Sequence, residues 1–297
     1  MCLHRRHDVP DRLVIEAALA KRRCQGFHHT RPALGGQRFS VPGRFSRSPC
    51  RIGLAMRLLL DAGAEMDAGL DNGRTALMEA ACDPSVIHLL VDYGADPNAC
   101  DVNGKTALMM AASHGCLDGI DALLQRKAAP RAVDNWGRTA LRIAAENGRP
   151  DVVWRLIEAG KESAGLDVLL REALGAAVQQ RKDHVARELI RQISLKRPHD
   201  PDLERALFLA IAEDRPTIIL ALAERGVDLN ARDPKGRTPL ECARSVPTFK
   251  LLADRGARLE KRDVLGRLIF ANQFELARLM LKHGANPNQK DRHGWTP

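Results

Sequence analysis

Apolar residues along this chain recur in short blocks that fit pairs of amphipathic helices better than strands. Ala-Ala pairs, as at Ala111-Ala112, mark one kind of block. Leu-Leu or Leu-Ile pairs, as at Leu123-Leu124, mark the block that follows. No single pair of blocks buries its apolar face alone, so neighbouring pairs must stack. The pattern predicts an all-α array of helix–turn–helix units.

A short motif recurs between the helix pairs. The segments that begin at Asp101, Asp134 and Asp233 all read Asp-x-x-Gly-Lys/Arg-Thr-Ala/Pro-Leu. A shortened copy begins at Asp71, a degraded copy at Asp263, and the chain ends inside a further copy. The Gly fits a tight turn with positive φ, and the Thr fits the N-cap of the next helix. These positions are Gly73, Gly104, Gly137, Gly236, Gly266 and Gly294, with Thr75, Thr106, Thr139 and Thr238.

The repeat continues through a stretch where the motif itself is lost. Aspartates stand at intervals of 33 residues, at positions 101, 134, 167, 200 and 233. Around Asp167 and Asp200 the Gly and Thr are missing, but Ala-Leu pairs keep the same phase. We therefore predict about seven units over residues 54–297, with two eroded units at 161–232 and a truncated last unit.

These motifs resemble the ankyrin repeat family. Segments similar to the closing half of the family pattern, Leu-Leu-x-x-Gly-Ala-Asp-x-Asn, are Leu89–Asn98 and Leu279–Asn288. The family's His after the motif Leu is replaced here, for example by Met78 and Met109. The resemblance implies a solenoid with short β-turn fingers, and Gly residues that end the second helices. Those glycines are Gly94, Gly160, Gly226, Gly256 and Gly284.

The resemblance also implies that another protein binds the concave face, where fingers and first helices lie. The residues expected there are Asn72, Arg74, Val102, Asn103, Lys105, His114, Asn135, Trp136, Arg138, Asn147, Lys235 and Arg237. Trp136, at a finger tip, is either a binding anchor or packing against the neighbouring turn. The basic row formed by Arg74, Lys105, Arg138, Arg237 and Arg267 either attracts an acidic partner or is neutralised by nearby acids.

Charge is concentrated outside the repeats. Residues 1–57 carry twelve basic and three acidic residues, which accounts for the net charge of +9, and the remaining 240 residues balance. Residues 1–50 are predicted to be a basic, disordered tail. A targeting segment and a misassigned start, with Met56 as the true start, are the alternatives. The tail also supports an alternative function, binding to nucleic acid or to a membrane surface.

Candidate chemistry is sparse. The seven cysteines include no Cys-x-x-Cys, which favours buried free thiols in a reducing compartment, and hence a cytoplasmic location. Cys and His residues near the N-terminus match no zinc-site spacing, and no catalytic or phosphate-binding motif is present. We expect a monomer without enzymatic activity, cofactor, metal, small-molecule substrate or membrane span.

Overall fold

The computed structural model describes residues 57–58, 60–61, 72–161, 165–193, 199–259, 265–288 and 296. Within these residues the fold is all-α, with fourteen helices. The predicted fold class is therefore confirmed. The predictions for residues 1–50 lie outside the described residues.

The chain divides into two compact units, residues 1–144 with 151–162, and residues 145–150 with 163–297. The first unit holds three helix pairs, apart from the end of α7 and the start of α8. These helices are α3 (Ala76–Glu79), α4 (Pro84–Asp92), α5 (Ala107–His114), α6 (Leu117–Gln125), α7 (Ala140–Glu146) and α8 (Pro150–Gly160).

The second unit contains four helix pairs, including two in the region where the motif is eroded. They are α9 (Leu166–Gln179) with α10 (Asp183–Gln192), α11 (Pro201–Ala212) with α12 (Pro216–Glu224), α13 (Pro239–Cys242) with α14 (Val246–Asp254), and α15 (Leu265–Phe270) with α16 (Phe274–Lys282). Residues 161–232 are thus mostly helical, with each helix pair in phase with the aspartate spacing.

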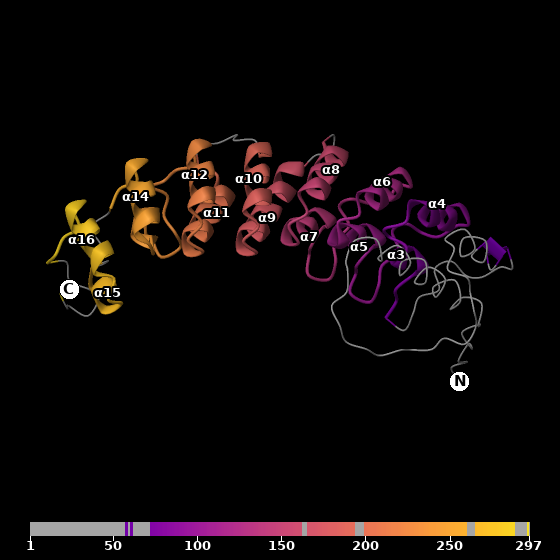
Figure 1. Ribbon diagram of the computed structural model, residues 1–297, viewed down its shortest axis with the longest axis horizontal. Coiled ribbons are helices and arrows are strands. Elements are labelled where there is room, and N and C mark those ends of the chain that lie inside the picture. Colours follow the sequence, from indigo (N-terminus) through magenta and orange to yellow (C-terminus); the bar gives the residue numbers. More distant parts are fainter. Residues whose placement is uncertain are drawn as a thin grey trace, which may run out of the picture. The chain divides into compact units, whose positions relative to one another are not determined.

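Within each unit the helices form two layers (Figure 1). In the first unit α3 contacts α5 and α4 contacts α6; in the second, α9, α11 and α13 form one layer and α10, α12, α14 and α16 the other. The first helix of each pair belongs to the inner layer, and the second helix belongs to the outer layer. Alanines are fully buried in the inner layer, for example Ala112 and Ala177, whereas Leu123 and Leu189 are fully buried on the outer helices. Small inner side chains let successive helices approach closely, which explains how a chain with few aromatic residues forms a core.

The motif threonines cap helices as predicted. The Thr75, Thr106 and Thr238 hydroxyls accept backbone N–H groups in the first turns of α3, α5 and α13. Thr139 Oγ1 accepts Arg142 N at 3.3 Å. At Thr238 the cap is reciprocal, because Glu241 accepts the Thr238 N–H in return.

Only one of the two eroded units replaces this cap. Asp200 stands at the register position of the finger aspartates, but it caps α11 directly and accepts the N–H groups of Asp202 and Leu203. Its carboxylate also pairs with Arg171, 2.7 Å away, and both side chains are nearly buried. Asp200 thus supplies the side-chain cap in place of the missing Thr. In contrast, α9 begins at Gly165 without a side-chain cap.

Most glycine predictions hold, with two corrections. The turn glycines at 73, 104, 137 and 236 have positive φ, as do the helix-ending glycines at 94, 226, 256 and 284. Gly266 instead lies inside α15, since the degraded motif there forms no finger within the described residues. Gly160 is the buried last residue of α8 and continues the helix. Gly294 lies outside the described residues.

The prediction of buried free thiols is wrong for Cys82 and Cys116, whose sulfurs form a disulfide. Their spacing of 34 residues, about one repeat, places them in neighbouring loops. Of the other described cysteines, Cys100 is exposed and Cys242 is half-buried. Cys2, Cys24 and Cys50 lie outside the described residues.

Candidate partner-binding surface

Three fingers are organised by the aspartate that opens the motif, namely Asp101, Asp134 or Asp233. Asp101 Oδ1 accepts the N–H groups of Asn103 at 2.9 Å and of Lys105 at 2.8 Å. The finger closes through Asp101 N–H, which donates to the Lys105 carbonyl at 3.0 Å. Asp134 and Asp233 make the equivalent bonds in their own fingers. Because the aspartate satisfies the turn N–H groups, the intervening side chains point outward for other contacts.

Backbone hydrogen bonds join successive fingers of the first unit. Val102 N–H donates to the Asn72 carbonyl at 3.1 Å, and Asn135 N–H donates to the Asn103 carbonyl at 3.0 Å. The Asn135 side chain adds a bond from Nδ2 to the Val102 carbonyl at 3.1 Å. The fingers therefore form a continuous platform. We call this the finger surface, made of Asn72, Arg74, Val102, Asn103, Lys105, Asn135, Trp136 and Arg138.

Gly104 allows this close approach. Its φ is +75°, and a Cβ at this position would lie 2.7 Å from Asn135 Oδ1 and 3.0 Å from Asn135 N. Gly137 has a similar φ of +69°, but nothing lies within 4 Å of a Cβ there. The turn geometry requires glycine at both positions, whereas contact with the next finger requires it only at Gly104.

Trp136 lies on the finger surface with 58% of its area exposed. Two cations face its ring: Lys105 Nζ is 5.9 Å from the centroid and Arg138 Cζ is 4.9 Å away. These cation–π contacts hold the indole on the surface without burying it. The exposed faces of Trp136 and Val102, which is 63% exposed, leave apolar area available for a partner.

The basic row is largely paired with acids. Arg74 binds Glu79 at 3.0 Å, Arg138 binds Asp134 at 2.8 Å, and Arg237 binds Asp233 at 2.6 Å. The side chain of Arg267 is not among those described. Lys105 differs, since its ammonium lies over Trp136 and no described acidic side chain forms an ion pair with it. Lys105 is therefore the member of the row best placed to meet an acidic partner.

Two finger aspartates, Asp134 and Asp233, have lowered pKa values, and so does Asp200 at the start of α11. Burial raises the pKa of the Asp134 carboxyl, but hydrogen bonds from the Arg138 backbone and side chain and from Trp136 N–H outweigh it, so the pKa lies below the ordinary value. Asp233 is lowered in the same way, with Arg237 as the main donor. Burial likewise opposes the lowering at Asp200, where Arg171 dominates. The carboxylates of Asp134, Asp200 and Asp233 therefore stay ionised at neutral pH.

The remaining predicted residues are dispersed. His114 is exposed at the end of α5, and its Nδ1 lies 2.6 Å from the Met110 carbonyl. Asn147 is exposed after α7, in the second unit. Lys235 and Arg237 form a separate finger of the second unit. The structure thus brings together the predicted residues of the first three fingers, whereas His114 lies at the end of α5 and the others belong to the second unit.

Exposed apolar residues outside the prediction include Val133, which is 57% exposed just before the Trp136 finger, and Phe270 and Phe274 between α15 and α16, which are 94% and 61% exposed. Val133 lies three residues before Trp136, so the motif register could have identified it. Trp154 is 40% exposed on α8 and belongs to the surface.

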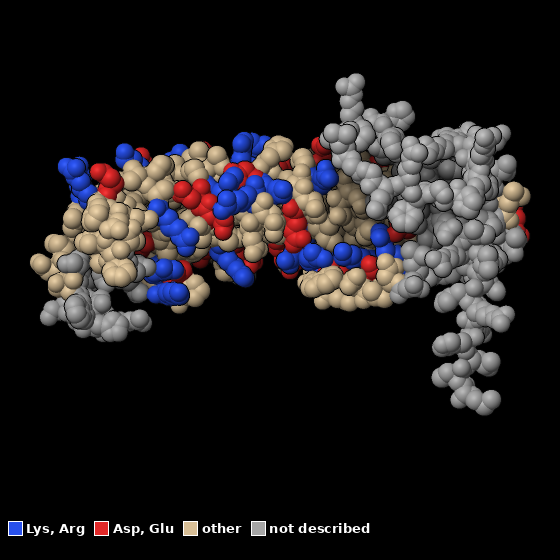
Figure 2. Space-filling model, turned by 60° about the horizontal axis from the view of Figure 1, so that its bottom comes forward, with Lys and Arg blue, Asp and Glu red and all other residues tan. Residues whose placement is uncertain are grey.

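Basic and acidic side chains are interspersed on the face shown in Figure 2. This agrees with the balanced charge of residues 58–297. A polyanion such as nucleic acid binds best to a broad positive field, which the described residues on this face do not form.

One described group has donors of the kind that ligate metals. His199 Nδ1 lies 3.4 Å from both Glu204 Oε1 and Asp228 Oδ2. The imidazole is 72% exposed, and the arrangement is that of a surface ion-pair cluster when the ring is protonated. The N-terminal Cys and His residues lie outside the described residues. None of the described helices has the length and apolar character needed to cross a membrane.

Comparisons agree with this architecture. A family model for ankyrin repeats, which represents three copies, matches residues 50–134 and 82–164. The ankyrin repeat domain of human ASB11 matches with a TM-score of 0.61 and 18% identity, covering 83% of this chain and 99% of that chain. The ankyrin repeat domain of Bcl-3, a member of the IkappaB family, matches with a TM-score of 0.61 and 24% identity, covering 84% and 100%. No curated protein sequence matches significantly.

Proposed function

Because the chain belongs to the ankyrin repeat family, we propose that it is a non-catalytic scaffold that binds a partner protein through the finger surface. Ankyrin repeat domains generally mediate protein–protein interactions. The observation that carries the proposal is the exposed Trp136 ring, which contacts Lys105 and Arg138 on a platform of hydrogen-bonded fingers. A rigid, exposed aromatic side chain is a common centre of binding energy at protein interfaces.

The surroundings of Trp136 define the kind of partner segment that fits. Val102 and Trp136 offer apolar area for an aliphatic or aromatic side chain. Lys105 offers a cation for a carboxylate beside that side chain. The exposed Asn135 side chain donates one Nδ2 hydrogen to the Val102 carbonyl, which fixes its orientation on this surface. The partner segment therefore combines one apolar anchor with a neighbouring acidic group.

The test compares two tryptophans in the full chain. Trp136 and Trp154 are both exposed and both face a cation, Lys161 Nζ lying 5.4 Å from the Trp154 centroid, but Trp154 stands on an outer helix. Proteins captured by the wild-type chain are purified, and their affinities for the wild type and for both variants are measured by calorimetry. We expect Trp136→Ala to weaken binding by about 1–3 kcal/mol, while Trp154→Ala leaves it within about 0.5 kcal/mol.

Lys105→Glu provides an electrostatic check on the same surface. We expect it to weaken binding of the same partner, mainly through a slower association rate and a changed dependence on salt. A partner that binds Trp136→Ala normally and Trp154→Ala poorly would place the interface on the outer helices instead. A partner lost on deletion of residues 1–50, with steep salt dependence, would favour the tail-driven alternative.

A further inference from the structure

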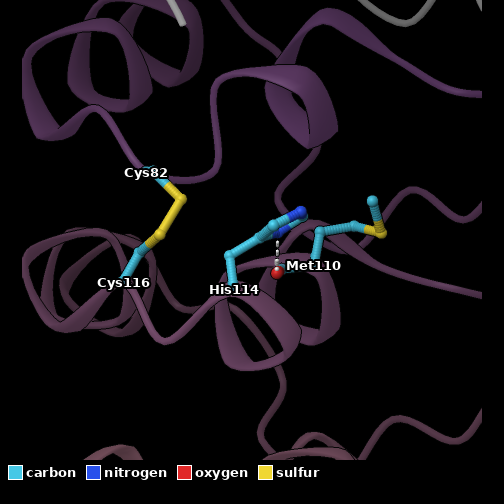
Figure 3. The surroundings of a disulfide bond; sticks show 4 residues. All are labelled: Cys82, Met110, His114 and Cys116. Carbon is cyan, nitrogen blue, oxygen red and sulfur yellow. Dashed lines mark hydrogen bonds between the residues drawn. A yellow bond between two sulfur atoms is a disulfide. The ribbon is translucent and has the colours of Figure 1, made fainter. Parts of the chain in front are cut away.

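Two half-buried cysteines join neighbouring repeats of the first unit at the loops between their helices (Figure 3). Cys82 precedes the N-cap of α4, and Cys116 is the N-cap residue of α6. Their Cα atoms are 5.2 Å apart and their sulfurs are bonded. The bond therefore connects one repeat to the next, and not two parts of one repeat.

Backbone packing brings these loops together independently of the sulfurs. Gly119, in the first turn of α6, is buried against the loop that carries Cys82. A Cβ at Gly119 would overlap the Ala81 carbonyl oxygen and lie 3.2 Å from Cys82 Cα. The two cysteines thus lie within bonding reach because the chain has no side chain at position 119.

The second unit uses hydrogen bonds where the first unit has the disulfide. Asp214, which precedes the N-cap of α12, accepts hydroxyls of Ser245 at 2.7 Å and Thr248 at 2.6 Å from the start of α14. Asp183, at the start of α10, accepts the Thr217 hydroxyl of α12 at 2.8 Å. The Thr248 and Thr217 links span 34 residues, as Cys82 and Cys116 do. These polar links form in any redox state, whereas the covalent link depends on it.

We propose that Cys82 and Cys116 form a thiol–disulfide exchange site through which glutathione sets how firmly the first described helix pair, α3–α4, is held on α5–α6. One cysteine thiolate attacks oxidised glutathione, which forms a mixed disulfide and releases one glutathione thiolate. The other cysteine thiolate attacks the protein sulfur of that mixed disulfide and releases the second. The two cysteines lose two electrons, glutathione gains them, and the two thiol protons pass to the two glutathione thiolates. Reduced glutathione reverses the reaction.

The disulfide lies next to α3, the shortest helix of the first unit. Helix α3 has four residues, half the length of α5, so it contributes little buried area of its own. The finger residues Asn72 and Arg74 lead directly into α3. If the proposed function holds, formation of the Cys82–Cys116 disulfide therefore stabilises one edge of the finger surface.

The exchange is tested on the full chain in glutathione buffers that range from almost fully reduced to almost fully oxidised. Equilibrium is approached from both directions, the thiols are blocked by alkylation, and the disulfides are mapped by peptide mass spectrometry. We expect the fraction of chains with the Cys82–Cys116 bond to rise reversibly with the proportion of oxidised glutathione. Cys100 and Cys242 should take no part in this disulfide. A bond that never forms, that survives every reducing buffer, or that exchanges partners with Cys100 would overturn the proposal.

The mechanical part of the proposal is tested by hydrogen exchange in the two redox states. Closing a loop of 34 residues is expected to slow exchange in α3 and α4 by roughly 100-fold on oxidation, with α9–α12 unchanged. The double variant Cys82→Ser/Cys116→Ser should lose this dependence, and the control Cys242→Ser should keep it. Equal exchange in the oxidised and reduced wild-type chain would overturn the proposal. Neither readout uses a partner, so their failure is separate from a failure of the Trp136 test.

Discussion

Replacing Gly119 by alanine should destabilise the first unit, although alanine is the better helix former. Gly119 lies in the first turn of α6 and is buried against the loop of the preceding repeat. A Cβ there would overlap the Ala81 carbonyl oxygen and lie 3.0 Å from Ala81 C. Both partners in this overlap belong to the backbone, so no side-chain rotation can relieve it, and the loop must move.

The magnitude follows from two opposing effects. Alanine in place of glycine stabilises a helix by about 0.5–1 kcal/mol. Overpacking a tight site costs about 1–3 kcal/mol, and a backbone overlap belongs at the upper end of that range. We expect Gly119→Ala to lower the free energy of unfolding by about 2 kcal/mol. Gly175→Ala is the matched control, because Gly175 lies inside α9 with nothing within 4 Å of a Cβ, and should gain about 0.5–1 kcal/mol.

Hydrogen exchange is the suitable assay, because it reports the opening free energies of α6 and α9 separately in one chain. The two variants should move in opposite directions, by about 3 kcal/mol in total. Similar protection in Gly119→Ala and wild type, or a gain like that of Gly175→Ala, would refute the reasoning. It would mean that the loop bearing Cys82 yields at negligible cost.

Three further predictions concern the Asp200 cap, the pH dependence of stability, and the local stability along the array. Asp200→Ala removes the cap of α11 and leaves Arg171 nearly buried without its partner, so the free energy of unfolding in urea should fall by about 3 kcal/mol. Asp121→Ala, which breaks a more exposed pair with Arg155, should lower it by under about 1 kcal/mol. The pKa values of Asp134, Asp200 and Asp233 are lower in the folded chain than in the unfolded chain, so these ionised carboxylates stabilise the fold. This contribution is fully present above the unfolded pKa of about 3.9 and is lost as the pH falls through the lower folded pKa values. Thermal unfolding should therefore show this loss only below about pH 4, and less of it in Asp200→Asn. Along the array, exchange should be slowest in residues 104–160 and fastest after about residue 260, where Phe270 is 94% exposed; uniform protection with one sharp transition would contradict this.

Local signals could be predicted from the sequence, whereas signals that depend on the neighbouring repeat could not. The caps at Thr106 and Thr238 follow from the motif alone, because a cap involves residues within one turn. Asp200 was aligned with the finger aspartates by its spacing, but without the turn Gly its carboxylate caps a longer helix directly. The Asp200-Pro201 pair was a readable helix-start signal that the spacing concealed.

The candidate surface divides in the same way. The motif register placed Trp136 at a finger tip, and its 58% exposure agrees with that position. Its contact with Lys105, from the preceding finger, depends on how successive fingers pack and has no local signature. The pairing of Arg138 with Asp134 lies within one finger, which is why the sequence could offer neutralisation of the basic row as an alternative. The Cys82–Cys116 pair could be predicted only by applying the repeat register to the loops, because a spacing near one repeat puts equivalent loop positions side by side.

The bond between Cys82 and Cys116 also fixes how far the chain can extend under tension. A fully extended stretch of 34 residues measures about 110 Å at ~3.3 Å per residue. In the oxidised protein the disulfide carries a pulling force past α4 and α5, so this stretch adds no such length to the chain. In the reduced protein the same unravelling releases the full length. The Asp–Thr links of the second unit give no such limit, since hydrogen bonds separate as the helices that carry them are pulled apart.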